Sequence, residues 1–216
     1  MVRSHFWTRA FRRYFPLLLF LWILLVLYPN PLNLVTSMQR IVNSDIDPVA
    51  VASLSKQVPS DPAAIERAVD QQIPYSYDWE TYGMPWYFPS VEEVLQKGKG
   101  DCKGRTLVLA SVFEAKDIPY TLNLSPIHMW VKYEEKEETK LENPGVKFYQ
   151  QDPETGERSL QVPNIPVSDI MDSFQQGFWE PMPGLRKALL LCGLTALIGL
   201  RLRWSRRGKE IQKGTQ

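Results

Sequence analysis

The hydrophobic and polar positions of the chain divide it into two long apolar runs and a central segment of mixed periodicity. Residues 14–28 read YFPLLLFLWILLVLY, and residues 188–200 also lack charged side chains. A membrane-spanning helix needs about 20 residues. When their flanks are included, with the bordering cations at the membrane interfaces, the two runs predict transmembrane helices over residues 14–35 and 184–204.

Each apolar run also has a second interpretation. The first run has the basic start and short apolar core of a cleavable signal peptide. However, Pro29-Asn30-Pro31 follows it, where a cleavage site would need small residues. The second run is also compatible with a buried core helix, although cations flank it on both sides. We therefore expect both runs to be retained as membrane anchors.

Charge is distributed unevenly along the chain. Residues 1–13 form a basic arm without acidic side chains, and residues 205–216 form a basic tail, whereas residues 14–185 carry 23 acidic and 13 basic side chains. Cytoplasmic segments beside membrane helices are enriched in Lys and Arg. Both termini are therefore expected in the cytoplasm, with the domain of residues 61–180 outside it. The acidic character of this domain disfavours nucleic acid as a partner.

The segment between the anchors begins with helical signals. Residues 36–60 are expected to form a connector, with one short helix over residues 47–57. Asp61 and Pro62 are typical of a helix start, and apolar positions at helical spacing follow them up to Ile73-Pro74. Ser90-Val91-Glu92-Glu93 has the pattern of a capping box and predicts a helix that ends at Gly98.

Strand signals dominate the second half of the domain. Alternating and β-branched runs predict strands over residues 120–124, 127–134 and 139–143, with a charged hairpin loop between the last two. Residues 143–166 are expected to form a long loop or an edge hairpin, and residues 168–178 a short helix. Helices followed by antiparallel strands indicate an α+β fold.

The chemistry of the chain concentrates on one Cys and one His. There are two of each, and Cys192 and His5 lie in or beside the terminal runs. Cys102 follows the turn Gly98-Lys99-Gly100-Asp101, and it begins a predicted helix over residues 102–116 that Asp101 is expected to cap. The positive end of a helix dipole favours a thiolate. A single Cys and a single His are too few for a structural zinc site.

His128 is the only histidine of the central segment and is therefore the candidate base that activates the thiolate. The predicted hairpin brings Glu142 and Asn143 opposite His128. Either residue is a candidate for orienting the imidazole, and strand alternation allows only one of them to face it. The aromatic side chains of residues 75–88 are compatible with core packing or with the wall of a groove. Trp86 and Tyr87 among them are candidate oxyanion or groove residues.

The order of these motifs resembles the transglutaminase-like branch of the papain-like cysteine enzymes. The resemblance covers about residues 60–145 and rests on the Gly-Asp-Cys turn, the His128-Met129-Trp130-Val131 strand and Leu141-Glu142-Asn143. It implies a nucleophile helix packed on a small antiparallel sheet, with Cys102 as nucleophile and His128 as base. The family usually has Asp as the third member, so the choice between Glu142 and Asn143 stays open.

The resemblance implies a membrane-anchored cysteine enzyme that acts on amide bonds of a peptide or protein through a Cys thioester. It is compatible with a peptidase, an amidase or an acyltransferase to an amine, and it implies neither a metal nor another cofactor. Two alternatives remain. In the first, Cys102 is an inert buried thiol. In the second, the domain is a non-catalytic scaffold that binds peptide or cell-envelope material.

Overall fold

The computed structural model describes most of the chain: residues 2–137, 139–142, 144–151 and 155–213, with the side chains of 2–12 and 206–213 left out. The chain divides into two compact units, and the first combines residues 1–33 with 182–216. The second unit comprises residues 34–181 and contains helices and an antiparallel sheet. The predicted α+β class is therefore confirmed.

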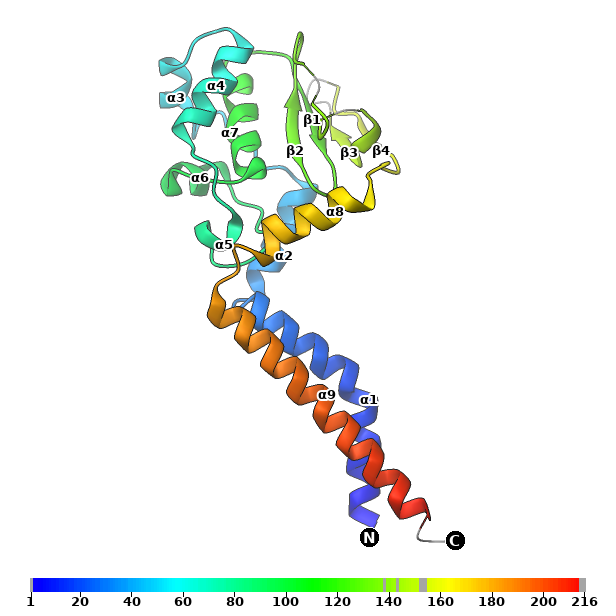
Figure 1. Cartoon of the computed structure of the whole chain (residues 1–216). Coiled ribbons are helices and arrows are strands. Elements are labelled where there is room, and N and C mark those ends of the chain that lie inside the picture. Colours follow the sequence, from blue (N-terminus) through cyan, green and yellow to red (C-terminus); the bar gives the residue numbers. More distant parts are fainter. Residues whose placement is uncertain (1, 138, 143, 152–154, 214–216) are drawn as a thin grey trace. The chain divides into compact units, whose positions relative to one another are not determined.

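The first unit is a pair of helices, α1 (Val2–Leu27) and α9 (Gly184–Lys213), which lie side by side with both termini at one end (Figure 1). Trp22 packs so closely on α9 that a Cβ at Gly193 would overlap its ring. The Arg186 guanidinium donates to the carbonyl oxygen of Val26 at 2.6 Å, and this bond satisfies a carbonyl at the end of α1.

The first predicted membrane helix, residues 14–35, is interrupted in the structure. Helix α1 ends at Leu27 and α2 (Leu32–Val42) is a separate helix. Pro29 and Pro31 explain the break, because proline lacks the N–H that would continue the hydrogen-bond ladder. Among the described residues, no single helix has the length and hydrophobicity of a membrane span. The segments Arg13–Leu27 and Leu32–Val42 meet both criteria only when they are taken together.

The helices of the second unit end where local sequence signals place their ends. Helix α4 (Pro62–Gln72) begins at Asp61, whose carboxylate accepts from the Ala64 N–H at 2.7 Å. Helix α6 (Val91–Lys97) has the predicted Ser90–Glu93 capping box and ends at Gly98. The φ of Gly98 is 61°, in the left-handed region that glycine adopts without strain. The connector contains α3 (Ala52–Gln57), which is shorter than the predicted helix over residues 47–57. A further short helix, α5 (Asp78–Thr81), lies within the aromatic segment of residues 75–88.

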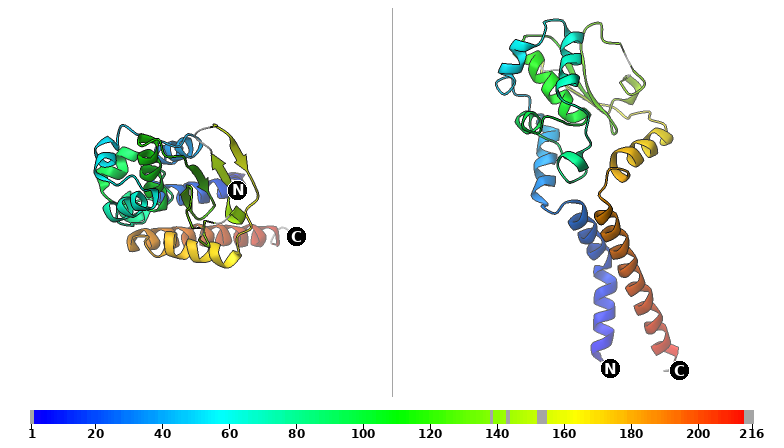
Figure 2. Two further views of the ribbon diagram at one scale, coloured as in Figure 1. Left: turned by 90° about the horizontal axis from the view of Figure 1, so that it is seen from above. Right: turned by 60° about the vertical axis from the view of Figure 1, so that its left-hand side comes forward.

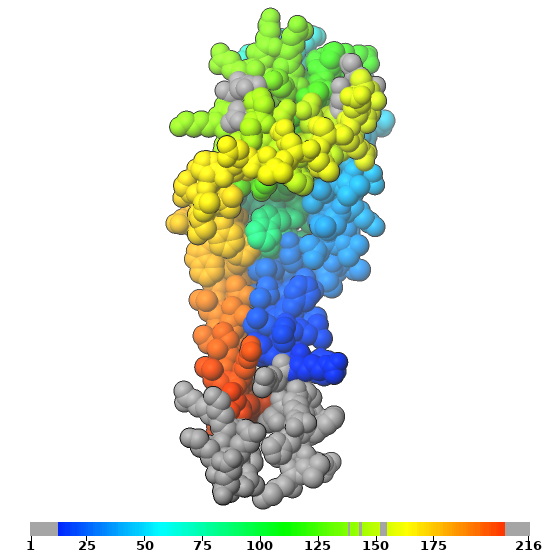
Figure 3. All heavy atoms as spheres, turned by 90° about the vertical axis from the view of Figure 1, so that its right-hand side faces the viewer, coloured from blue at the N-terminus to red at the C-terminus, as the bar shows by residue number. Residues whose placement is uncertain are grey.

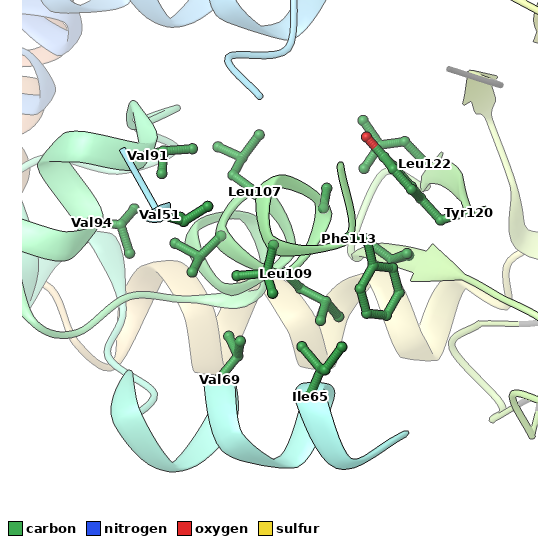
Figure 4. Close-up of a cluster of buried hydrophobic side chains, with 14 of the residues drawn as sticks. Val51, Ile65, Val69, Val91, Val94, Leu107, Leu109, Phe113, Tyr120 and Leu122 are labelled. Carbon is green, nitrogen blue, oxygen red and sulfur yellow. The ribbon is translucent and has the colours of Figure 1, made fainter. Parts of the chain in front are cut away.

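Helix α7 (Cys102–Ala115) runs through the centre of the domain (Figure 4). It is buried from Thr106 to Phe113, and apolar side chains of α4, α6 and the sheet surround it. Figures 1 and 2 show that α3, α4, α6 and α7 all lie on one side of the sheet. Burial on every side fixes both the rotation and the depth of α7, and so its first turn has one position.

Within the described residues the sheet has four antiparallel strands in the order β2-β1-β3-β4. They are β1 (Thr121–Leu124), β2 (Met129–Lys132), β3 (Tyr149–Gln151) and β4 (Arg158–Leu160). Leu122 pairs with Val131 across β1 and β2. Strand β2 packs on α7, where the Thr106 hydroxyl donates to the carbonyl oxygen of Met129 at 2.9 Å.

The third predicted strand, residues 139–143, is wrong in its described part. Residues 139–142 form a turn, and the strand that pairs with the free edge of β1 is β3 from the predicted edge hairpin. Leu141 is the only apolar side chain among residues 139–142 and is 43 % exposed, so a strand there would bury little surface. Pro144 then starts a 3₁₀ turn (Pro144–Val146), which ends any extended run.

Two helices flank this core. Helix α2, which was predicted only as anchor and connector, belongs to the domain: Ser37 Oγ accepts from the Phe88 N–H, and the Arg40 guanidinium pairs with Glu93 at 2.7 Å. Helix α8 (Val167–Phe174) continues into a π-helical turn (Gln175–Trp179), here called η2, and confirms the helix predicted over residues 168–178. Figure 3 shows α8 running across one face of the domain.

The contact between α6 and α7 gives a test of the fold. A Cβ at Gly104 would lie 3.1 Å from Val94 Cγ2, and Val94 is fully buried and has no room to move. Gly104→Val should therefore lower the free energy of unfolding by about 1–3 kcal/mol through overpacking, as measured by urea denaturation. Ala115→Val places the same valine side chain at an exposed position of α7 and should have little effect. Equal losses in both variants would contradict the proposed packing.

Candidate functional site

Cys102 is the first residue of α7, and its side chain is partly exposed. Asp101 caps the helix by accepting from the backbone N–H groups of Lys103 and Gly104. The preceding turn is tied to an extended segment: the Gly100 N–H donates to the Pro74 carbonyl at 3.2 Å, and the Gly100 carbonyl accepts from Ser76 at 3.0 Å. The thiol therefore lies at the positive end of a rigid helix.

His128 lies directly before β2 and is held by a tight turn. The Ser125 hydroxyl accepts from the His128 N–H at 2.9 Å, and the Ser125 N–H donates to the His128 carbonyl at 2.7 Å. The imidazole stacks on the Trp130 ring, with centroids 5.8 Å apart and planes 11° apart. The turn and the stacking together fix the orientation of the imidazole.

The structure brings Cys102, His128 and Glu142 together. His128 Nε2 lies 3.3 Å from Glu142 Oε1, and Cys102 and His128 line the same two cavities. Burial alone would lower the pKa of His128, but its interactions with Cys102 and Glu142 outweigh burial and raise the pKa to about 9. The arrangement therefore favours the imidazolium form of His128 beside the Glu142 carboxylate.

The remaining residues predicted for the site have different positions. Asn143 lies outside the described residues. Trp86 is 57 % exposed and lines the groove beside Cys102. The Tyr87 side chain is buried instead, where its hydroxyl donates to Glu93 at 2.9 Å and accepts from Arg40. Tyr87 thus joins α2 to α6, and it is not among the described residues that line the groove.

Sequence reasoning missed a buried charge cluster beneath Cys102. The Lys103 ammonium pairs with both Asp78 and Asp101, and Asp78 Oδ2 also accepts from the Tyr87 N–H at 2.9 Å. Burial raises the pKa of Asp78 to about 7 despite the Lys103 charge. The sequence signal was an acidic residue within an aromatic stretch, where a carboxylate needs a buried partner.

A second missed element supports Glu142. Lys136 was predicted in a charged hairpin loop, and its ammonium is largely buried, 3.4 Å from Glu142 Oε1 and 2.8 Å from Glu66. It also donates to the Val131 carbonyl at 3.0 Å. Burial alone would raise the pKa of Glu142, but His128 and Lys136 together hold it below its ordinary value. Lys136 therefore holds the Glu142 carboxylate in position, although Glu142 lies in a turn and not in a strand.

Two cavities meet at the Cys–His pair. A groove of about 600 Å³ and a small polar cavity of about 140 Å³ share Cys102 and His128 in their linings. The small cavity also contains Glu142, Lys136 and Arg105. A carbonyl group in the groove would therefore lie beside the thiol, and the small cavity is large enough for water or a small amine next to the same pair.

Helix α8 and η2 form one wall of the groove. Phe178 stacks on Trp86 with centroids 4.8 Å apart, and it contacts Trp79 edge-on at 6.0 Å. Trp86 has a φ of 46°, which is uncommon for a side chain of this size. The stacked rings of Phe178 and Trp86 connect η2, which follows α8, to the segment before α6.

No group of His, Cys, Asp and Glu side chains among the described residues has the arrangement of a metal site. Comparisons with known protein families, curated proteins and solved structures find no match to this chain. The functional argument therefore rests on the geometry of the site.

The raised pKa of His128 gives a pH test. The imidazole should titrate near pH 9 in the folded protein, as measured by NMR, and Glu142→Gln or Cys102→Ser should lower the midpoint because each removes an interaction that raises the pKa of His128. The raised pKa of His128 contributes to the free energy of unfolding. This contribution is complete below the pKa of the unfolded state, about 6.5, and is lost as the pH rises through about 9. The stability advantage of wild type over Glu142→Gln should shrink across that window.

Glu137→Gln is the matched control for this titration. It removes one carboxylate from an exposed position of the same segment. The midpoint of His128 should stay near 9 in this variant. An unchanged midpoint in Glu142→Gln would contradict the ion pair between His128 and Glu142.

Proposed function

We propose that the protein is a membrane-anchored, transglutaminase-like cysteine enzyme that acts on amide bonds through a thioester on Cys102. The observation that supports it is the position of His128, whose imidazole contacts Glu142, lines the same two cavities as Cys102 and has a pKa of about 9. A thiolate, an imidazolium and an orienting carboxylate are the groups that thiol-mediated acyl transfer needs.

In the first half of the reaction, the Cys102 thiolate attacks the carbonyl carbon of the amide and forms a C–S bond. The negative charge that develops on the carbonyl oxygen is stabilised by the backbone N–H of Cys102 at the start of α7, because Asp101 already accepts from the next two N–H groups. His128 then gives its proton to the leaving nitrogen as the C–N bond breaks. The products are a thioester on Cys102, a free amine and a neutral imidazole.

In the second half, neutral His128 takes a proton from water or from an incoming amine, which attacks the thioester carbonyl. The C–S bond breaks and restores the thiolate and the imidazolium. Water makes the protein an amidase or peptidase, and an amine makes it an acyltransferase. Glu142 stays ionised throughout, because its role is to orient the imidazole and stabilise its positive charge.

The nucleophile is tested by alkylation of the full-length protein in a Cys192→Ser background, where Cys102 is the remaining thiol. Iodoacetamide should modify Cys102 rapidly at pH 7, and His128→Ala should slow the reaction because no imidazolium then favours the thiolate. The rate is measured by mass spectrometry. Equal rates in both proteins would contradict the ion pair and favour a non-catalytic scaffold that binds through the groove.

The same protein is then screened against amide substrates. A covalent thioester on Cys102 should be trapped at low pH and should be absent in Cys102→Ser. Glu142→Gln should lower kcat by orders of magnitude, by analogy with the aspartate of a catalytic triad, and Glu137→Gln should not. Full activity in Glu142→Gln would return the orienting role to Asn143 or to another residue.

The proposed location rests on charge. Basic residues lie beyond each apolar run, so we place both termini in the cytoplasm and the domain of residues 61–180 outside it. Reporters fused at residue 1 and at residue 216 should both be cytoplasmic, and protease added to the outside of intact cells should cleave between residues 155 and 165. A terminus found outside, or a mature chain that begins after residue 30, would overturn this topology.

A further inference from the structure

The groove beside Cys102 carries an excess of negative charge. Four aspartates line it: Asp78, Asp101, Asp169 and Asp172. Among the described lining residues, Lys103 is the one lysine or arginine. Lys103 pairs with both Asp78 and Asp101, and burial raises the pKa of Asp78 to about 7, so Asp169 and Asp172 supply most of the excess charge at neutral pH. The imidazolium of His128 already has Cys102 and Glu142 as partners. The groove therefore attracts cations.

Asp78 has an unused hydrogen-bond acceptor in this lining. Its side chain is 6 % exposed, and its Oδ2 already accepts from Tyr87 and Lys103. Its Oδ1 has no hydrogen-bond partner among the described residues. A buried carboxylate oxygen without a donor costs free energy.

Asp169 and Asp172 extend the negative surface onto the opposite wall. Both lie on α8, both are exposed, and both line the groove. The stack of Phe178 on Trp86 holds this wall in place. Carboxylates thus occupy the floor beside Cys102 and the α8 wall.

Much of the remaining lining is apolar. It consists largely of aliphatic and aromatic side chains from α2, the sheet turn and the segment before α6: Ile41, Phe88, Leu124, Ile127 and Met129. An apolar surface beside carboxylates matches a side chain with a long aliphatic stem and a cationic end. Lysine and arginine have this shape.

We propose that the groove selects an amide substrate whose chain carries an ammonium or guanidinium group, that is, a lysine- or arginine-bearing peptide. The aliphatic stem lies on the apolar surface, and the cationic end lies among Asp78, Asp169 and Asp172. This selection rests on the proposed function, because it concerns the substrate of that same site.

The charge of the groove is tested with three small methanethiosulfonates that differ only in their side group: 2-aminoethyl (cationic), 2-sulfonatoethyl (anionic) and methyl (neutral). The Cys102 thiolate attacks the sulfenyl sulfur of the reagent, a mixed disulfide forms and methanesulfinate leaves. Rates are measured on full-length protein in the Cys192→Ser background and are divided by the rates with a free thiol. The cationic reagent should react about tenfold faster than the anionic one, and the ratio should approach one in 1 M salt.

Variants assign the selectivity to residues. Asp169→Asn/Asp172→Asn should lower the ratio of cationic to anionic rates several-fold while the neutral rate stays unchanged. Glu134→Gln/Glu135→Gln removes the same charge from exposed positions that do not line the groove and should leave the ratio unchanged. Asp78→Asn should also lower the ratio, and thermal unfolding shows whether that variant is folded.

The two proposals fail in different ways. A ratio near one, or a faster anionic reagent, overturns the cationic substrate whatever the neutral rate is. A neutral rate no faster than that of a free thiol argues against the nucleophile while the ratio still reports the charge of the groove. Failure of all three reagents to reach Cys102 overturns both. On a verified substrate, replacing lysine by norleucine should lower kcat/KM about tenfold or more in wild type and less in Asp169→Asn/Asp172→Asn.

Discussion

The burial of α7 is the constraint on which the site depends. Apolar neighbours surround the helix on every side, so it can neither rotate nor slide without opening the core. The first turn is then fixed by three local features: the Asp101 cap, the shared ion pair of Lys103 and the close contact of Gly104 with Val94. A nucleophile on this turn keeps its position without help from a flexible loop, which is what thioester chemistry requires.

Much of this arrangement was predictable because it is encoded locally. The caps at Asp61, Ser90 and Asp101 use short side chains that bond backbone N–H groups two or three residues ahead, and such signals are visible in sequence. Helix α2 and strand β3 are different. Each is specified by distant partners, as in the bond from Phe88 to Ser37 and the pairing of β3 with β1, and a local pattern does not contain that information.

Glu142 shows how a prediction about a site can depend on the wrong structural element. A hairpin was expected to bring it opposite His128, whereas residues 139–142 form a turn, and the two side chains still meet at 3.3 Å. The force that brings them together is electrostatic. Lys136, held by Glu66 and the Val131 carbonyl, provides a fixed cation beside the Glu142 carboxylate. The charged run that contains Lys136 looked like a hairpin loop because its partners lie on α4 and β2.

The sharing of one Glu142 oxygen between His128 and Lys136 also sets the strength of the base. A carboxylate with histidine as its only partner would stabilise the imidazolium strongly and would oppose transfer of the proton to a leaving amine. Lys136 weakens the interaction between Glu142 and the imidazolium, because the same Oε1 accepts from both cations. The imidazole is therefore oriented firmly but releases its proton more easily than an isolated pair would allow. Both properties would serve the proposed acyl transfer, in which His128 donates a proton in the first step and accepts one in the second.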